Sequence, residues 1–327
     1  MHFYMRYSKD FTFTNFVETN NLEKIKIALG RELELREFID RKGNSLVSVA
    51  IEKGDLKLLE FLISKEADLN VVNADGKTPL MIAASKRSEE ILRMLLENGA
   101  EIDKRNDRNS DRYKWTALMY AVNIGYSKGV KILIENGADV NKKDNDGWTA
   151  LMLAASSNDK EMVKHLLTHP KIEINNQDLK GKTALIHAAE NGALDVVDLL
   201  LNNRVDINKV DNSNKTALHY MVSGTYFINK EQQHNLILNF IKQGADLYKK
   251  PEHGLSIYDS ANSEIRNFIE ESFPHEVEPS TELLEENIKK SRKFLPKEKF
   301  LPRSNTTGKP VTWAGRTAYK SEEGRGF

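Results

Sequence analysis

The sequence of 327 residues contains no cysteine, and this absence removes several classes of function at once. Disulfide frameworks, cysteine zinc sites, iron–sulfur clusters and thiol nucleophiles are all excluded. No stretch approaches about 18 consecutive apolar residues, so we expect no membrane-spanning helix, and residues 1–16 lack the apolar core of a signal peptide. The 48 basic and 48 acidic side chains cancel, which argues against charge-driven binding to nucleic acid or to a membrane surface. We therefore expect a soluble, cytoplasmic monomer.

A short pattern recurs along the chain at nearly constant spacing. It consists of Thr or Ser, then in most copies a small residue or Pro, then an apolar residue. In every copy but the sixth, Ala follows five positions after the hydroxyl residue. The leading hydroxyl residues are separated by 33, 38, 33, 34, 33 and 40 positions. They are Ser45, Thr78, Thr116, Thr149, Thr183, Thr216 and Ser256. Since such a side chain can cap the first turn of a helix, each copy predicts the start of a short helix.

A second helix is predicted in most copies by apolar pairs such as Leu95-Leu96 and Leu166-Leu167, about 17 residues later. Gly-Ala follows at Gly99, Gly137 and Gly244, where Gly suits a left-handed helix end. One such unit is too small to bury a core alone, so the units must stack. The pattern resembles the ankyrin repeat, whose period is about 33 residues and whose signature is Thr-Pro-Leu-His-x-Ala. The resemblance covers roughly residues 12–273.

This resemblance implies an all-α ankyrin-repeat solenoid of helix–turn–helix units, with β-hairpin-like finger loops between units and a flexible C-terminal tail. The chain then divides into an N-terminal segment with a truncated capping repeat (1–39), the repeats (40–273) and the tail (274–327). The repeats are expected to begin near residues 40, 73, 111, 144, 178, 211 and 251. Five extra residues within 104–113 should lengthen the third finger, and seven around 223–233 should lie between the helices of the sixth repeat.

The tail differs from the repeats in composition. It holds five of the eight prolines, and from Lys289 to the end 11 basic residues accompany 3 acidic ones. We expect it to be largely disordered, with a helix at 280–295. Its role stays open between a solubilising arm and a segment that docks on a partner or on the repeats. Contact with nucleic acid or phospholipid is less favoured, because the basic residues are dispersed.

Residues suited to catalysis or metal binding are sparse. No phosphate-binding loop and no Gly-x-Ser-x-Gly motif is present. Glu161, His165 and His169 share a helix face at a spacing that zinc could use, but an ordinary solvated surface is the better interpretation. The resemblance implies a structural role for His219, at the His of the signature, while we interpret His187 as a partly buried imidazole with satisfied hydrogen bonds. We predict no catalytic residue, no metal and no cofactor.

Proteins built from such repeats generally bind other proteins through finger tips and inner helices, which line one concave face. These positions in the third to fifth repeats are occupied by Arg112, Tyr113, Trp115, Ile124, Asn145, Asp146, Trp148, Lys180 and Lys182. Trp115 and Trp148 share one register, so we expect them to be neighbours one repeat apart. Aromatic residues are frequent interface anchors. Alternatively, an aromatic residue before this Thr packs on the next finger.

The predicted function is a non-enzymatic scaffold or inhibitor that holds a protein partner on the concave face, with a second contact through the tail. The abundance of Asn, Lys and Ile and the lack of cysteine are typical of a bacterial or phage source. Two alternatives follow from such a source. One is an effector secreted into a host cell, and the other is an antitoxin or immunity-type inhibitor of a partner enzyme.

Overall fold

The computed structural model describes residues 44–73, 75–106, 114–223, 230–248, 255–272, 312–313 and 316–317. The chain forms two compact units, Met1–Ile269 and Glu270–Phe327. The truncated repeat expected at 1–39 and the helix expected at 280–295 lie outside the described residues. Among the helices that are described, none has the length and apolarity needed to cross a membrane.

A short inner helix follows each recurring Thr or Ser in the described residues. These helices are α3 (Leu46–Lys53), α5 (Pro79–Ser85), α7 (Ala117–Asn123), α9 (Ala150–Ser156), α11 (Ala184–Glu190), α13 (Ala217–Ser223) and α15 (Ile257–Ser260). Except before α13, the hydroxyl oxygen accepts a hydrogen bond from the backbone N–H three residues ahead, as predicted. Before α13, the backbone N–H of Thr216 instead donates to Nδ1 of His219 at 3.0 Å.

An outer helix completes each pair and runs beside the inner one. The outer helices are α4 (Leu56–Ser64), α6 (Glu89–Glu97), α8 (Ser127–Glu135), α10 (Lys160–Leu167), α12 (Leu194–Leu201), α14 (Lys230–Lys242) and α16 (Ser263–Ser272). Gly99, Gly137 and Gly244 follow α6, α8 and α14 at φ of 84°, 90° and 91°, the left-handed conformation that was predicted. Because α14 begins at Lys230, the last part of the insertion expected between the sixth pair's helices belongs to the helix itself.

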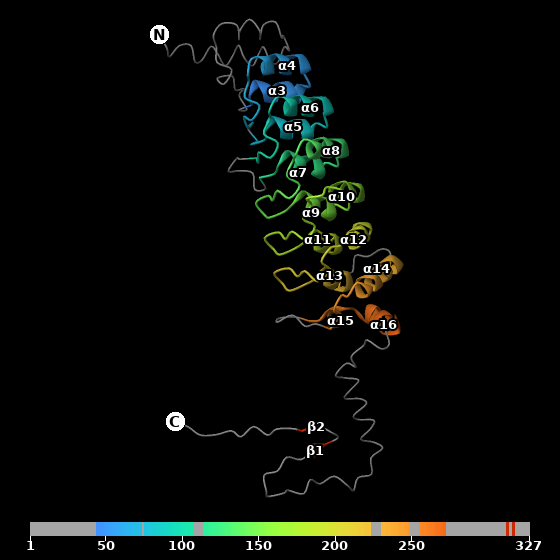
Figure 1. Ribbon diagram of the computed structural model, residues 1–327. Coiled ribbons are helices and arrows are strands. Elements are labelled where there is room, and N and C mark those ends of the chain that lie inside the picture. Colours follow the sequence, from blue (N-terminus) through green and yellow to red (C-terminus); the bar gives the residue numbers. More distant parts are fainter. Residues whose placement is uncertain are drawn as a thin grey trace, which may run out of the picture. The chain divides into compact units, whose positions relative to one another are not determined.

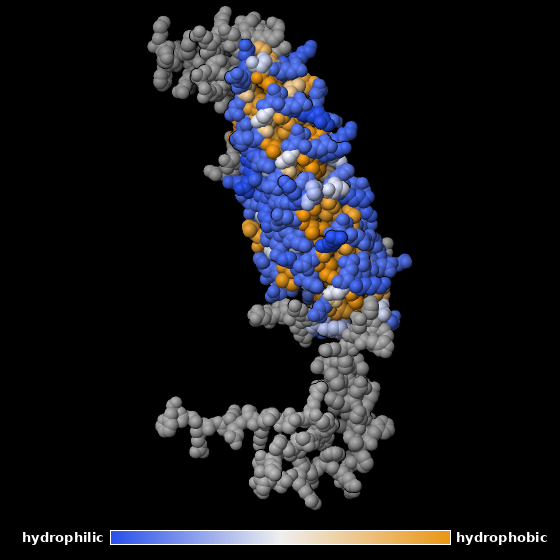
Figure 2. All heavy atoms as spheres, viewed as in Figure 1, coloured by the Kyte–Doolittle hydropathy of each residue, from blue (hydrophilic) through white to orange (hydrophobic). Residues whose placement is uncertain are grey.

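The helix pairs stack in the order of the sequence, with the finger loops along one side (Figure 1). Each inner helix contacts the next inner helix, and the outer helices from α6 to α14 do the same. Paired alanines at Ala83-Ala84, Ala154-Ala155 and Ala188-Ala189 are at most 1% exposed, so their small size lets neighbouring inner helices approach closely. Figure 2 shows apolar residues gathered over the helices and hydrophilic residues over the fingers. One continuous core therefore runs through the stack.

The fingers are closed by an Asn or Asp that lies five residues before the capping Thr. In Asn73, Asp144, Asp178 and Asp211 the side-chain Oδ1 accepts from the backbone N–H groups two and four residues ahead. In the third repeat the backbone N–H of Asn106 donates to the carbonyl of Trp115 at 3.0 Å, so the extra residues lie between these two positions. Arg112 and Tyr113 belong to that insertion and lie outside the described residues.

The repeats are all-helical, and the fold class predicted from the sequence is confirmed for them. The described part of the second unit adds two strands of two residues each, β1 (Thr312–Trp313) and β2 (Arg316–Thr317). They pair antiparallel, with Thr312 opposite Thr317. No pattern in the sequence had indicated this pair.

The close approach of the fourth and fifth fingers gives a test of the fold. Gly147 has φ of 82°, and a Cβ on it would lie 2.8 Å from the backbone nitrogen of Leu179. Gly99 has a similar φ of 84°, but a Cβ there would meet nothing within 4 Å. Both alanine variants bear the left-handed strain of about 1–2 kcal/mol, while only Gly147→Ala must also push two fingers apart. We expect Gly147→Ala to lower the free energy of unfolding in urea by more than Gly99→Ala; equal losses would contradict the finger contact.

Candidate partner-binding site

A cavity of about 430 Å³ opens between the fingers of the third, fourth and fifth repeats. Its volume lies within the range of roughly 300–1,000 Å³ that is usual for ligand pockets. The residues that line it are Trp115, Asp144, Asp146, Trp148, Leu153, Asp178, Leu179 and Lys180. We call this the inter-finger cavity. Since α9 supplies only Leu153 and the loops before α7, α9 and α11 supply the others, the finger turns largely determine its shape.

Two of the lining carboxylates are held rigidly by their own finger turns. Oδ1 of Asp144 accepts from the backbone N–H groups two and four residues ahead at 2.9 and 2.8 Å. Asp178 makes the same two hydrogen bonds at 2.9 and 2.8 Å. Both residues are only 7% exposed. The wall of the cavity is thus fixed by local sequence, and each carboxylate keeps a second oxygen for another partner.

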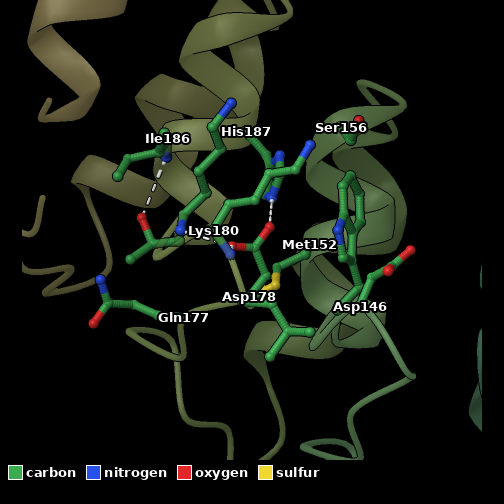
Figure 3. A network of polar contacts seen from close by, with 12 residues as sticks. Asp146, Met152, Ser156, Gln177, Asp178, Lys180, Ile186 and His187 are labelled. Carbon is green, nitrogen blue, oxygen red and sulfur yellow. Dashed lines mark hydrogen bonds and ion pairs between the residues drawn. The ribbon is translucent and has the colours of Figure 1, made fainter. Parts of the chain in front are cut away.

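In the fifth and sixth repeats that second oxygen bonds to the inner helix of the same repeat. Oδ2 of Asp178 lies 2.9 Å from Nε2 of His187, and Figure 3 shows the carboxylate directed toward the imidazole. The hydroxyl of Tyr220 donates to Oδ2 of Asp211 at 2.6 Å in the same way. His187 and Tyr220 both lie four residues after the capping Thr, so one position in the repeat supplies the donor.

The fourth repeat breaks this rule, because Leu153 occupies the donor's position. Oδ2 of Asp144 instead accepts from the indole Nε1 of Trp115, at 3.0 Å, which belongs to the preceding repeat. The packing of an aromatic residue on the next finger, left open by the sequence, therefore occurs at Trp115. The same contact makes its indole one wall of the cavity.

The remaining surface of the cavity is largely aromatic and aliphatic. The Trp148 ring lies 4.0 Å from the His187 ring, centroid to centroid, at an interplanar angle of 39°. Trp115 meets Tyr120 edge-to-face at 5.4 Å and 74°. Leu179 is 70% exposed although it is apolar. An exposed leucine beside two half-buried indoles is the kind of surface that a protein partner covers.

Burial shifts the pKa of Asp144, which lines the cavity, and of His187, which lies behind Asp178. Desolvation raises the pKa of Asp144, and its hydrogen bonds from the Trp148 backbone and the Trp115 indole offset only part of this. Desolvation likewise lowers the pKa of His187, and the hydrogen bond to Asp178 works in the opposite direction. His187 is therefore a neutral donor at neutral pH, and the Asp178 charge beside it is not balanced by a cationic imidazole.

The structure brings four of the nine candidate binding residues into one cavity: Trp115, Asp146, Trp148 and Lys180. Ile124, Asn145 and Lys182 are not among its lining residues. Asn145 is exposed on the fourth finger, Lys182 forms an ion pair with Glu190 at 2.6 Å, and the Ile124 carbonyl accepts from Arg87. The two remaining candidates, in the insertion at 107–113, are not described.

Sequence reasoning missed three of the lining residues, namely Asp144, Leu153 and Asp178. A signal for two of them was present, because an Asn or Asp recurs five residues before the capping Thr. Leu153 also departs from the Tyr or His found at its position in the third, fifth and sixth repeats. Leu179 was not among the nine candidates, but it lies at the tip of the fifth finger, a position that the family resemblance assigns to the binding face.

No group of three or more His, Asp or Glu side chains in the described residues is arranged to hold a metal ion. Of the three residues considered as zinc ligands from the sequence, Glu161 and His169 have other partners. Glu161 pairs with Lys164 at 2.7 Å, and Nδ1 of His169 accepts from the Lys171 backbone at 3.3 Å. The sequence was interpreted as giving His187 satisfied hydrogen bonds and partial burial. Its bond to Asp178 agrees with the first part, and its 4% exposure shows that it is more fully buried than expected.

The lowered pKa of His187 predicts a loss of stability in acid. The unfolded chain protonates this imidazole near its ordinary value of 6.5, while the folded chain takes up the proton only at lower pH. Protonation thus favours unfolding, and stability declines as the pH falls through 6.5 toward the folded value. In His187→Gln we expect a shallower loss of unfolding free energy between about pH 7.5 and 5.5. His165→Gln, at an exposed position on α10, is the matched control and should keep the unmodified slope.

Comparison with known proteins gives relatives from a virus and from animals. The chain is 33% identical over 138 residues to an ankyrin repeat protein of fowlpox virus, FPV031, covering 41% of this chain and 39% of that protein. It is 31% identical over 171 residues to mouse ankyrin repeat and SAM domain-containing protein 6, covering 47% of this chain and 19% of that protein. The chain thus spans well under half the length of these relatives.

A solved structure and a family model describe the repeats themselves. The ankyrin repeat domain of Bcl-3, a member of the IκB protein family, aligns with a TM-score of 0.60 at 26% identity, covering 69% of this chain and 98% of that one. A model of ankyrin repeats matches residues 15–106, 104–178 and 151–250. These matches cover well over half of the sequence. The chain therefore belongs to the ankyrin repeat family.

Proposed function

We propose that this chain is a non-enzymatic scaffold or inhibitor that holds a protein partner against the inner side of its stack, centred on the inter-finger cavity. Ankyrin repeats generally mediate protein–protein interaction, and the family is typically non-catalytic. The observation that carries the proposal is the convergence of two indoles and the exposed Leu179 on one cavity. Aromatic anchors in desolvated pockets usually dominate the energy of an interface.

The surroundings of the cavity suit an extended partner segment. The Leu179 backbone N–H donates to the Asp146 carbonyl at 3.0 Å, and the Asn212 N–H donates to the Lys180 carbonyl at 2.9 Å. These bonds tie successive finger tips together, so a bound segment would meet a preformed surface and little ordering cost would be added on binding. Adjacent fingers could extend the contact, and the tail could supply a second one.

The alternatives raised by the sequence require the same binding step. A secreted effector would hold a host protein, and an immunity-type inhibitor would cover the active site of a partner enzyme. The relatives are viral and animal proteins, so a bacterial source stays a prediction from composition. We propose action in the cytoplasm. A chain without cysteine forms no disulfide bonds and so gains nothing from an oxidising compartment.

Truncation of the aromatic anchors tests the proposal. Partners are captured from a lysate by the full chain, and retention of each is compared with that by Trp115→Ala/Trp148→Ala. We expect at least a tenfold loss of affinity for a true partner, since hot-spot residues contribute about 2 kcal/mol or more. Because Trp115 also bonds to Asp144, Trp148→Ala/Leu179→Ala is the second variant and leaves that hydrogen bond in place.

The matched control removes exposed apolar surface elsewhere. Val210 and Leu255 are 40% and 59% exposed and lie outside the cavity lining. Val210→Ala/Leu255→Ala should retain the partner as the unmodified chain does. If both cavity variants stay folded by circular dichroism and bind every partner normally, the inter-finger cavity is not the binding centre.

A further inference from the structure

Two buried carboxylates in the cavity wall carry their charge among neutral donors. Asp144 accepts from backbone N–H groups and the Trp115 indole, and Asp178 accepts from backbone N–H groups and the His187 imidazole. Within the described part of the chain, neither forms an ion pair with a Lys or Arg. The raised pKa of Asp144 is the expected result of burial without a cation. A positive group entering the cavity would relieve this cost.

The lining of the cavity is negative overall. It holds the carboxylates of Asp144, Asp146 and Asp178 against the single ammonium of Lys180, three negative charges and one positive, a net of −2. The nearby Lys182 is paired with Glu190 at 2.6 Å, and the Lys143 ammonium donates to the Gln177 carbonyl at 2.8 Å. A cleft with one sign of charge and low-dielectric walls concentrates its field on whatever enters.

We propose that the inter-finger cavity holds the guanidinium group of an arginine carried by an extended segment of the protein partner, an inference that rests on the proposed function. The indoles of Trp115 and Trp148 supply ring surface on which a planar cation can stack. The wall carboxylates supply the charge. An arginine fits both demands, because its guanidinium is weakly hydrated, stacks on aromatic rings and bonds to carboxylates through a fixed fork. A lysine ammonium offers a point charge and no stacking plane.

The charge of Lys180 distinguishes an arginine ligand from an acidic one. It lines the cavity, its residue is exposed, and no ion pair of the described residues includes it. An entering arginine is repelled by this ammonium, whereas an acidic segment would be attracted to it. Removal of the Lys180 charge should therefore strengthen arginine binding and weaken the binding of an acidic ligand.

The probes are five-residue blocked peptides that differ only in a central Arg, Lys, Leu or Glu, titrated into the full chain. The chain has three tryptophans, so ¹⁵N-labelled indole groups give three N–H signals in the NMR spectrum. We expect the Arg peptide to shift the signals of Trp115 and Trp148 saturably and to leave that of Trp313, in the second unit, in place. Its Kd should be several-fold lower than that of the Lys peptide and lower still than those of Leu and Glu.

Matched variants assign the effect to charge. Asp178→Asn should weaken the Arg peptide about tenfold. It should keep its finger, because Asn73 makes the same two turn hydrogen bonds in the second repeat and the new amide can donate to Nε2 of His187 in its other tautomer. Asp211→Asn changes the equivalent residue outside the cavity and should leave the Kd unchanged. Lys180→Gln should tighten binding about fivefold, while Lys131→Gln on the outer helix α8, 72% exposed, should have no effect.

Three outcomes would overturn the proposal: a preference for the Leu peptide, a preference for the Glu peptide with weaker binding by Lys180→Gln, or a Lys peptide that binds as tightly as the Arg peptide. Such outcomes leave the proposed function intact if the tryptophan variants still lose a captured partner. Conversely, saturable Arg binding together with normal partner capture by the tryptophan variants would retain the arginine site and remove the proposed function.

Discussion

The side-chain oxygen that closes each finger turn is the contact on which the inter-finger cavity depends. In Asp144 and Asp178 one carboxylate oxygen accepts two backbone N–H groups and so satisfies donors that a tight turn would otherwise leave unpaired. This fixes the direction of the second oxygen, which then selects the neighbouring side chain that can reach it. The positions of the Trp115 indole and of the His187 imidazole follow from that choice, and with them two surfaces around the cavity.

The same contact explains why charge accumulates in one part of the stack. The second repeat closes its finger with Asn73, which makes the turn without a charge, whereas the fourth to sixth repeats use Asp. For the turn alone the two residue types are equivalent. The aspartates therefore add an electrostatic cost that turn geometry does not require, since their partners are neutral and burial disfavours the ionised form. Two of these three aspartates, Asp144 and Asp178, line the cavity. A buried negative charge without a cationic partner is what a binding site for a cation requires.

Most of the fold could be predicted from the sequence because its determinants are local. The hydroxyl cap and the Gly after α6, α8 and α14 act within one repeat, and the paired alanines recur at a fixed position in it. A period of about 33 residues was therefore enough to place them. The cavity could not be predicted to the same extent. Whether Trp115 points to solvent or reaches Asp144 depends on the spacing between two fingers, and the 70% exposure of Leu179 depends on how the fifth finger meets the fourth. Tertiary distances of this kind leave no periodic signal.

Departures from the repeat pattern, and not the pattern itself, give this surface its individual chemistry. A framework shared by all repeats presents the same atoms at every step and cannot distinguish one partner from another. Leu153 replaces the donor found in the fifth and sixth repeats, and this single change lets the preceding repeat supply the donor through Trp115. This departure falls in the fourth repeat, which supplies four of the eight residues that line the cavity.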